Sequence, residues 1–304
     1  MNKIKPKMLQ KGDTIAIISP SGYVSYQEKF EVAKQYFEDK GYKVKIFPNA
    51  KNKNNYLAGS DDERLQDLQD AFSDNNVKMI LTSRGGYGAA RIIDKIDYSI
   101  IKDNPKIFCG YSDITAFHSA IYKKTGLITF LAPFALADFG VENVDKYTEE
   151  SFWNIFNSNF LNENLKNAFE YTCINKGIIE GELIGGNLCV LTSILGSEFK
   201  PDFENKILYI EDVNEPLYKI DRMLTQLKLN KVFEKVKGIL VGKFSSDETD
   251  FDNKILDLLK EIKIPCGYGF SATHETNKAT LPLNVNYKID FSKGQVSLLE
   301  NYLI

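Results

Sequence analysis

Apolar positions in the first third of the chain follow two alternating patterns. Short apolar runs at Thr14 to Ser19, Tyr42 to Phe47 and Val77 to Thr82 are typical of strands, whereas Tyr26 to Lys40 and Asp61 to Phe72 carry apolar residues at helical spacing. Repeated strand–helix units of this length predict an α/β fold that begins with a doubly wound, mostly parallel sheet covered on both faces.

The same alternation continues through a glycine-rich loop and a predicted helix from Ala89 to another strand. That strand begins at Lys106 and runs into Gly110-Tyr111-Ser112, after which a helix is predicted as far as Lys124. In such sheets ligands bind beyond the carboxyl ends of the strands. We therefore expect the loops 20–22, 83–88 and 110–112 to meet at a site.

A polar stretch rich in Asn and Glu, from Asp138 to Tyr171, separates the two halves of the chain. Within it, Trp153 and Phe156 are spaced for one buried helix face. We expect an N-terminal domain over residues 1–165 and a C-terminal domain over 166–304. The second half predicts strands over 177–184, 206–210 and 238–244, helices over 188–195, 218–229 and 251–262, and a terminal hairpin over 285–291 and 295–299.

Composition narrows the class of protein. The 304 residues are 43% apolar and 26% charged, which suits ordinary globular cores, and 41 acids stand against 38 scattered bases. The basic residues form no cluster that would bind nucleic acid or an anionic membrane, and no apolar stretch is long enough to span a bilayer. The cysteines lie far apart, unlike a zinc site or a disulfide scaffold, so we expect reduced core residues in a cytoplasmic protein: Cys109, Cys173, Cys189 and Cys266.

Ser112 is the first candidate for chemistry. A sharp strand-to-helix turn can project its hydroxyl as a nucleophile and aim the amide of Asp113 at a developing oxyanion. The alternative is that Ser112 caps the following helix. A serine nucleophile also requires a base within hydrogen-bond reach.

The chain has only two histidines, so the search for that base is short. His118 is six residues beyond Ser112 on the same predicted helix, well away from the serine's face, and is expected to be structural. His274 stands in a polar, irregular stretch and is either the base or an ordinary loop histidine. A carboxylate to orient it could be Glu211 or Asp212, at a strand end, and the residue pattern does not choose between them.

The loop Arg84-Gly85-Gly86-Tyr87-Gly88 also has two interpretations. Its spacing fits neither the P-loop nor the dinucleotide fingerprint, although glycines of this kind can hold a phosphate. Alternatively, Gly85 or Gly86 brings a second oxyanion amide close to substrate. Arg84 suits a carboxylate, and a strand-end or capping role is the other possibility.

Taken together, these segments resemble the LD-carboxypeptidase family, the serine peptidases that include murein tetrapeptide carboxypeptidases and microcin C immunity hydrolases. The resemblance runs nearly end to end. Its motifs are Gly12-Asp13-Thr14-Ile15-Ala16, Ser19-Pro20-Ser21-Gly22, Ala58-Gly59-Ser60-Asp61 with Arg64, Arg84 to Gly88, Gly110-Tyr111-Ser112-Asp113, Gly181 with Gly185-Gly186-Asn187-Leu188, Glu211-Asp212, and His274 with Leu281-Pro282. Where the family commonly has glycine, this chain has Thr273 and Asn284.

The resemblance implies a catalytic triad of Ser112, Glu211 and His274. It also implies an N-terminal domain like class I glutamine amidotransferases, a C-terminal α/β domain with a barrel-like sheet, and a homodimer. The expected oxyanion donors are Asp113, Gly85 and Gly86, and the expected substrate-binding residues are Arg84, Tyr87 and Asn187. No metal and no cofactor are expected.

By the same resemblance the substrate is a cytoplasmic murein tetrapeptide, from which the enzyme releases D-alanine during peptidoglycan recycling. The runner-up within the family is a peptidyl or aminoacyl nucleotide. Such enzymes hold the nucleotide base with an aromatic loop, for which the short region from Pro133 to Phe139 offers little room and only Phe134 and Phe139 as aromatic contacts. A third hypothesis, from a different class, is a non-catalytic protein that binds a small anion with the same glycine loops.

Overall fold

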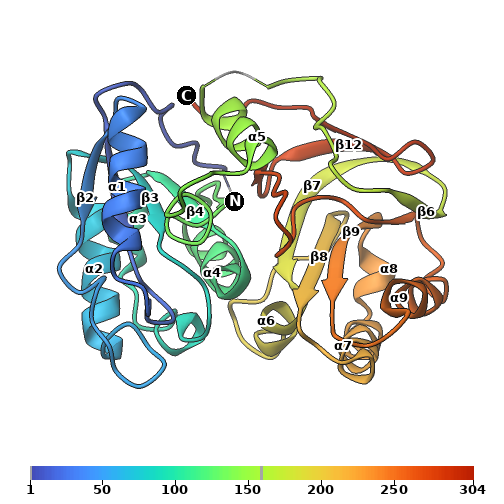
Figure 1. The fold of residues 1–304 in the computed structure, drawn as a ribbon. Helices are drawn as coiled ribbons and strands as arrows, with labels where there is room; N and C mark the ends of the chain where they lie inside the picture. The colour runs from blue at the N-terminus through green and yellow to red at the C-terminus, as the bar shows by residue number, and fades with distance from the viewer. Residues whose placement is uncertain (1, 158–159) are drawn as a thin grey trace.

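The computed structural model describes residues 2–157 and 160–304 and has two α/β domains, each built on one sheet (Figure 1). The first sheet has the order β11-β5-β4-β3-β1-β2 and is parallel except at β11. Its strands are β1 (Thr14–Ile18), β2 (Lys43–Ile46), β3 (Val77–Thr82), β4 (Ile107–Gly110), β5 (Phe130–Leu131) and β11 (Leu281–Pro282). The predicted parallel sheet is therefore confirmed.

The second sheet is mixed and curls into a half-barrel, as expected. Its order is β13-β12-β7-β8-β9-β10-β6, with a parallel centre from β7 to β10. Its strands are β6 (Thr172–Asn175), β7 (Ile178–Asn187), β8 (Ile207–Val213), β9 (Gly238–Ser245), β10 (Cys266–Tyr268), β12 (Asn286–Asp290) and β13 (Gln295–Leu298).

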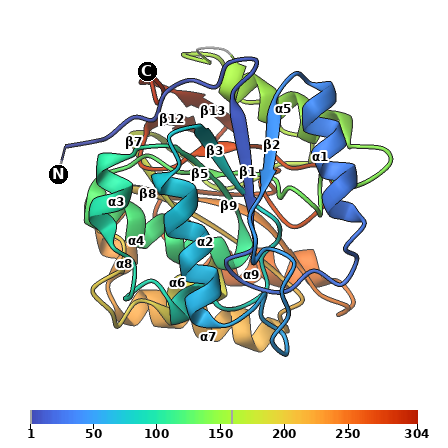
Figure 2. The same cartoon turned by 90° about the vertical axis from the view of Figure 1, so that its left-hand side faces the viewer.

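Helices surround both sheets. In Figure 2, α1, α2 and α3 lie around the strands of the first sheet. Helix α4 lies on the side of that sheet nearer the second domain and packs against α6 and β7. The helices are α1 (Lys29–Asp39), α2 (Asp61–Ser73), α3 (Tyr98–Asp103), α4 (Thr115–Thr125), α5 (Lys146–Asn157), α6 (Leu188–Ser193), α7 (Leu217–Leu229), α8 (Val232–Lys235) and α9 (Phe251–Leu259).

Strand β8 shows how the second sheet separates two cores. Ile207 and Tyr209 belong to an apolar cluster that is continuous with the first domain, whereas Leu208 and Ile210 belong to a second cluster packed with residues of α6, α7 and α9. Successive strand residues point to opposite faces, so this alternation follows from period two. The domains are consequently joined by packed apolar side chains.

The two halves of the chain also exchange segments. Strand β11, from the second half, adds antiparallel to β5 at the edge of the first sheet. Conversely, Asn162 and Leu165 donate backbone hydrogen bonds to Leu298 and Val296 on β13. The domain limits 1–165 and 166–304 stay a prediction, and Asn162 and Leu165 contact the second sheet directly.

Three local expectations are wrong. The helix predicted from Ala89 is only a short 3₁₀ turn, Ala89–Arg91, and α3 begins anew after Asp97, whose carboxylate accepts the Ser99 amide as an N-cap. Helix α1 begins at Lys29, and Tyr26 before it is exposed. Cys189 is exposed and Cys173 only half-buried, so the expected core position holds for Cys109 and Cys266 alone. No helix in the described part of the chain is long and apolar enough to cross a membrane.

Candidate active site

The turn after β4 holds Ser112 in a strained backbone conformation. Ser112 has φ of +59°, a left-handed value that costs a non-glycine residue about 1–3 kcal/mol and is typical of a nucleophile elbow. Gly110 before it must be glycine, because a Cβ there would overlap the Thr82 hydroxyl and Ile114. The short helical turn Ser112–Ile114 then leads into α4. The N-cap of this turn is Tyr111, so Ser112 is not a helix N-cap.

His274 is held by Glu211. Its Nδ1 lies 2.6 Å from the Glu211 Oε2, and the Glu211 side chain is buried at 1% exposure. The Tyr111 ring packs edge-on against the imidazole, with the ring centroids 4.9 Å apart. With Nδ1 turned to the carboxylate, Nε2 is the nitrogen available to receive a proton.

Two opposing effects act on the pKa of His274. Burial of the ring lowers the pKa, whereas the negative charge and hydrogen bond of Glu211, with help from the charge of Asp212, raise it. The net result is a pKa above the ordinary histidine value. The protonated imidazole is therefore stabilised here, as a base that must carry a proton during turnover requires.

Ser112 and His274 line one cavity of about 460 Å³, although they come from different domains. Within the described residues, no hydrogen bond joins the Ser112 hydroxyl to the imidazole. Helix α4 shows why the other histidine takes no part: His118 is buried, and its Nε2 lies 2.8 Å from the Gly110 carbonyl oxygen. Burial lowers its pKa to about 4, and the expectation of a structural His118 is confirmed.

Glu211 and Asp212 have different partners, which the sequence pattern left open. The β8–β9 register shifts between Ile210 and Asp212. Asp212 accepts hydrogen bonds from the Asn187 side chain and the Cys189 amide, at 2.8 Å each, so it supports the start of α6. Only Glu211 contacts the imidazole.

Asn187 does not line the cavity. It is buried at 4% exposure, its side-chain oxygen caps α6 at Val190, and its amide nitrogen lies within hydrogen-bond distance of both Glu211 and Asp212. Asn187 thus contacts both acids without lining the cavity. A direct role of Asn187 in substrate binding stays a prediction.

The glycine loop lies directly against the nucleophile. A Cβ on Gly85 would be 2.8 Å from the Ser112 Cβ and 3.0 Å from its Oγ. Behind it, the Gly22 amide donates to the Gly85 carbonyl at 3.1 Å, and a Cβ on Gly22 would meet that same oxygen. Only bare backbone can approach this closely, so Gly85 lies directly against Ser112, and the oxyanion role of the Gly85 and Gly86 amides stays a prediction.

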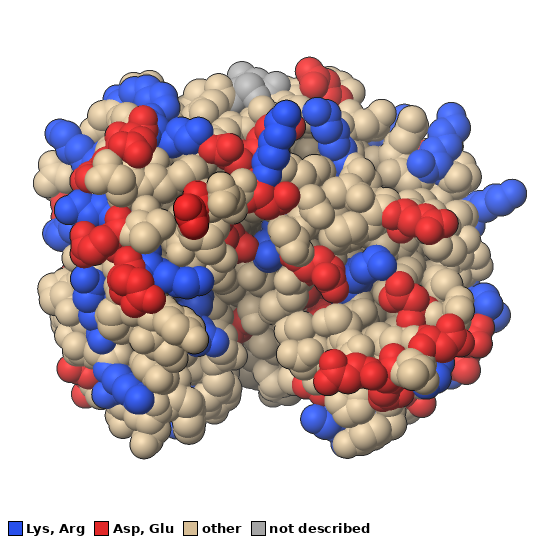
Figure 3. All heavy atoms as spheres, in the orientation of Figure 1, with Lys and Arg blue, Asp and Glu red and all other residues tan. Residues whose placement is uncertain are grey.

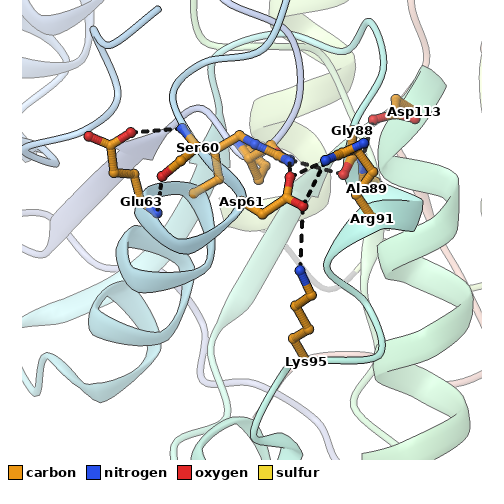
Figure 4. Close-up of polar contacts among 10 residues, drawn as sticks. Ser60, Asp61, Glu63, Gly88, Ala89, Arg91, Lys95 and Asp113 are labelled. Atoms are coloured by element: carbon orange, nitrogen blue, oxygen red, sulfur yellow. Dashed lines mark hydrogen bonds and ion pairs between the residues drawn. The ribbon is translucent and has the colours of Figure 1, made fainter. Parts of the chain in front are cut away.

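A buried ion pair ties this loop to the nucleophile turn (Figure 4). Arg64 is 1% exposed, pairs with Asp61, and donates to the carbonyl oxygens of Pro20 and Gly88, the latter at 2.9 Å. The next amide, Ala89, donates to the Asp113 carboxylate at 2.8 Å. The side chain of Asp113 is thus structural, which leaves its backbone N–H, in the first helical turn, as the expected oxyanion donor.

Asp61 gathers three cations in this network. Besides Arg64, its carboxylate is contacted by Arg91 at 2.8 Å and Lys95 at 3.4 Å. Hydrogen bonds from Arg91 first, and from Arg64 and Lys95, lower the pKa of Asp61 to about 2 against the effect of partial burial. The motif from Ala58 to Arg64 therefore anchors the two loops beside Ser112.

Arg84 and Tyr87 lie at the open edge of the site. Arg84 lines the cavity with Ser112, and its guanidinium donates to the Tyr23 carbonyl at 3.0 Å. Tyr87 is 50% exposed and lines an adjoining hollow with Arg84. Figure 3 shows acidic and basic side chains interspersed over one face of the molecule, with a hollow between the two domains at its lower edge. In the described residues no group of three or more His, Cys, Asp and Glu side chains could hold a metal ion.

Sequence reasoning missed several residues of this cavity. Lys29 and Tyr26 line it with Ser112. Nothing in the sequence distinguishes Lys29 from the other lysines of the chain. Of the two expected aromatic contacts, Phe134 lines the cavity and stacks on Tyr111 with centroids 4.0 Å apart, whereas Phe139 packs into the core against Phe152.

Comparisons with known proteins identify the family. Two family models match the chain: LD-carboxypeptidase N-terminal domain over residues 15–132 and LD-carboxypeptidase C-terminal domain over residues 180–289. A Bacillus subtilis protein named probable murein peptide carboxypeptidase is 44% identical over 240 residues, which are 79% of this chain and 75% of that protein. The Escherichia coli microcin C7 self-immunity protein MccF is 33% identical over 329 residues, covering 97% of this chain and 95% of the relative.

Solved structures give the same picture. The apo structure of MccF superposes with a TM-score of 0.91 at 31% identity and covers 99% of this chain and 100% of its own. A muramoyltetrapeptide carboxypeptidase from Oxalobacter formigenes superposes with a TM-score of 0.82 at 28% identity, covering 96% and 100% of the two chains. This chain therefore shares its two domains, and the way they are arranged, with these proteins.

Proposed function

The chain belongs to the LD-carboxypeptidase family, and from that premise we propose that it is a serine carboxypeptidase that hydrolyses an L,D-peptide bond and releases the terminal D-alanine of murein tetrapeptide. One observation carries the proposal. The His274–Glu211 pair, with Nδ1 and Oε2 2.6 Å apart, stands at the cavity that Ser112 also lines. A nucleophile, an oriented base and oxyanion amides in one cavity are the parts that acyl transfer needs.

In the proposed reaction, the Ser112 hydroxyl oxygen attacks the scissile carbonyl carbon and its proton passes to His274 Nε2. The amides of Asp113 and of Gly85 or Gly86 receive the oxyanion, each contributing on the order of a hundredfold or more in rate. The C–N bond then breaks as His274 returns the proton to the leaving amine. Water, deprotonated by His274, hydrolyses the resulting ester and restores Ser112.

A carboxypeptidase must also recognise a terminal carboxylate. Arg84 and Lys29 both line the cavity, and neither forms an ion pair with any described acidic side chain. Unpaired cations near a nucleophile favour an anionic substrate, and a guanidinium suits a planar carboxylate particularly well. We propose that these two side chains supply that recognition.

The direct test incubates the protein with murein tetrapeptide and follows the products by mass spectrometry. We expect free D-alanine and the tripeptide from the wild-type protein and neither product from Ser112→Ala. Undiminished release by Ser112→Ala would refute the assignment of the nucleophile. A protein that leaves tetrapeptide intact and does not react with a fluorophosphonate probe would instead support the non-catalytic anion-binding hypothesis.

The second candidate is hydrolysis of a peptidyl or aminoacyl nucleotide. It is favoured by the similarity to MccF and by Phe134, an aromatic side chain that lines the cavity and whose ring stacks on Tyr111. Parallel turnover measurements with tetrapeptide and with an aminoacyl sulfamoyl or phosphoramidate nucleotide decide between them, because the preferred substrate has the higher kcat/KM.

The proposal also includes a cellular location and an oligomeric state. By family resemblance we propose a homodimer that works in the cytoplasm in peptidoglycan recycling. The four cysteines are free thiols, which accords with a reducing compartment. Light scattering of the purified protein tests the dimer, and cell fractionation of the producing organism tests the location.

A further inference from the structure

A second hollow adjoins the cavity of Ser112. It measures about 500 Å³ and is lined by Gly22, Tyr23, Tyr56, Arg84, Gly86 and Tyr87. Arg84 and Gly86 line both spaces, so the hollow continues directly from the nucleophile. Its floor is backbone, because a Cβ on Gly86 would lie 3.2 Å from the Cα of Gly22. A substrate bound at Ser112 can therefore extend across Gly86 into the hollow.

The hollow is marked by unusually exposed aromatic rings. Tyr56 is 60% exposed and Tyr87 is 50% exposed. Together with Tyr26, which is 65% exposed and lines the cavity of Ser112, they account for three of the eight large apolar side chains most exposed in the described structure. Exposed aromatic rings that gather around one site indicate a ligand.

Both rings stand on fixed backbone. Tyr56 lies in a tight turn closed by reciprocal hydrogen bonds between Asn54 and Leu57, and its carbonyl accepts from the Tyr23 amide at 3.1 Å. Tyr87 belongs to the loop that Arg64 holds through the Gly88 carbonyl. One face of Tyr23 is already covered by the ammonium of Lys53, 4.3 Å from the ring centroid. The two exposed rings of Tyr56 and Tyr87 therefore stand ready before a ligand binds, and we call this pair the platform.

The geometry of the platform selects the kind of ring. The centroids of Tyr56 and Tyr87 are 5.9 Å apart and their planes are inclined by 56°, so a flat base cannot stack on both at once. A chair-shaped saccharide can lay C–H groups on both tilted faces and direct its hydroxyls to the phenol oxygens of the two tyrosines. We propose that this hollow is a saccharide subsite that receives the sugar at the far end of the muropeptide stem. The inference rests on the proposed function, since the peptide must place its scissile bond at Ser112.

The test compares kcat/KM on N-acetylmuramyl tetrapeptide and on the free tetrapeptide. The ratio is kcat/KM for the muramyl substrate divided by kcat/KM for the free tetrapeptide. We expect Tyr56→Ala and Tyr87→Ala to lower this ratio about tenfold, because truncation removes a stacking face. Tyr56→Phe keeps the ring and should retain the ratio. Tyr218→Ala is the matched control, since Tyr218 is 64% exposed on α7 and lines neither space.

Binding measured without turnover separates this inference from the proposed function. In Ser112→Ala, saturation transferred from tyrosine ring protons should reach the sugar protons of the muramyl ligand, and Tyr56→Ala should abolish that transfer. If the wild-type protein cleaves both substrates, but the kcat/KM ratio and the saturation transfer are unchanged in Tyr56→Ala and Tyr87→Ala, the saccharide subsite is wrong and the proposed function stands. If the wild-type protein cleaves neither substrate, both fail together.

Discussion

The guanidinium of Arg64 holds the carbonyl oxygen of Gly88 at a distance of 2.9 Å, deep beneath the surface. The amide on the other side of that peptide bond, Ala89, is held by Asp113, the residue after the nucleophile. One peptide unit therefore connects the glycine loop to the Ser112 turn, and it is held by an arginine of α2, one strand earlier in the sequence, that pairs with Asp61.

Removing Arg64 should damage both stability and activity. Arg64→Met removes the donor to the carbonyls of Pro20 and Gly88 and one of the three cations that contact Asp61, so we expect a loss of about 2–4 kcal/mol in the free energy of unfolding. Urea denaturation measures it. Arg91→Ala is the control: Arg91 binds the same carboxylate but its side chain is 43% exposed, and its loss should cost at most about 1 kcal/mol. Equal losses in the two variants would contradict the anchoring role of Arg64.

Gly85→Ala should reduce turnover while the fold remains. The new Cβ would sit 2.8 Å from the Ser112 Cβ, so either the serine or the loop must move from the position that serves the oxyanion. We expect kcat to fall about a hundredfold or more, the effect of losing one oxyanion donor. Gly196→Ala provides the comparison, since no atom lies within 4 Å of a Cβ there. Unchanged kcat in Gly85→Ala would argue against close approach of this loop to the reacting atoms.

Glu211→Gln should change the pH profile as well as the rate. His274 acts as a base only when neutral, and Glu211 raises its pKa, so the acidic limb of kcat/KM in the wild-type enzyme should lie above the ordinary histidine value of about 6.5. Without the carboxylate, burial dominates and the limb should move to lower pH. We expect kcat to fall by about 10³- to 10⁴-fold. A limb that stays in place would mean that another group titrates there.

His118 should make the protein less stable as the pH falls. Its pKa is lowered to about 4 in the fold, so between about pH 6.5 and pH 4 the unfolded chain binds the proton more readily and the folded state loses up to about 3 kcal/mol. Buried acids such as Asp67, whose pKa is raised to about 6, act in the opposite direction. The measurement is therefore the difference between wild type and His118→Gln in urea at pH 7 and pH 4.5. A difference independent of pH would contradict the neutral, buried imidazole.

Much of the fold could be predicted because its elements follow local patterns. Strand β3 spans Val77–Thr82, as its apolar run predicts, and α2 spans Asp61–Ser73, one residue beyond the predicted end, with Ser60 and Glu63 forming a capping box. The turn at Ser112 was visible as a strand, a Gly-x-Ser step and a helix. Asn284, where the family commonly has glycine, adopts φ of +62°, a conformation that asparagine tolerates.

Other features depend on contacts between residues far apart in the chain. The predicted helix from Ala89 is one 3₁₀ turn, and its start at Gly88 and Ala89 is held by Arg64 and Asp113, contacts that no local periodicity records. Glu211 and Asp212 have different partners at a shift of register between two strands, β8 and β9. The platform of Tyr56 and Tyr87 joins two loops that are thirty residues apart.

The sequence by itself determined the alternation of strands and helices, the residue types available for acyl transfer, and the family to which they belong, because each is written in short stretches of neighbouring residues. Tertiary structure decided which of two adjacent acids contacts His274, which face of the glycine loop meets Ser112, and what Asn187 does. Those outcomes depend on how strands pair and how side chains of the two domains pack. Such long-range contacts produce no periodic pattern in the sequence.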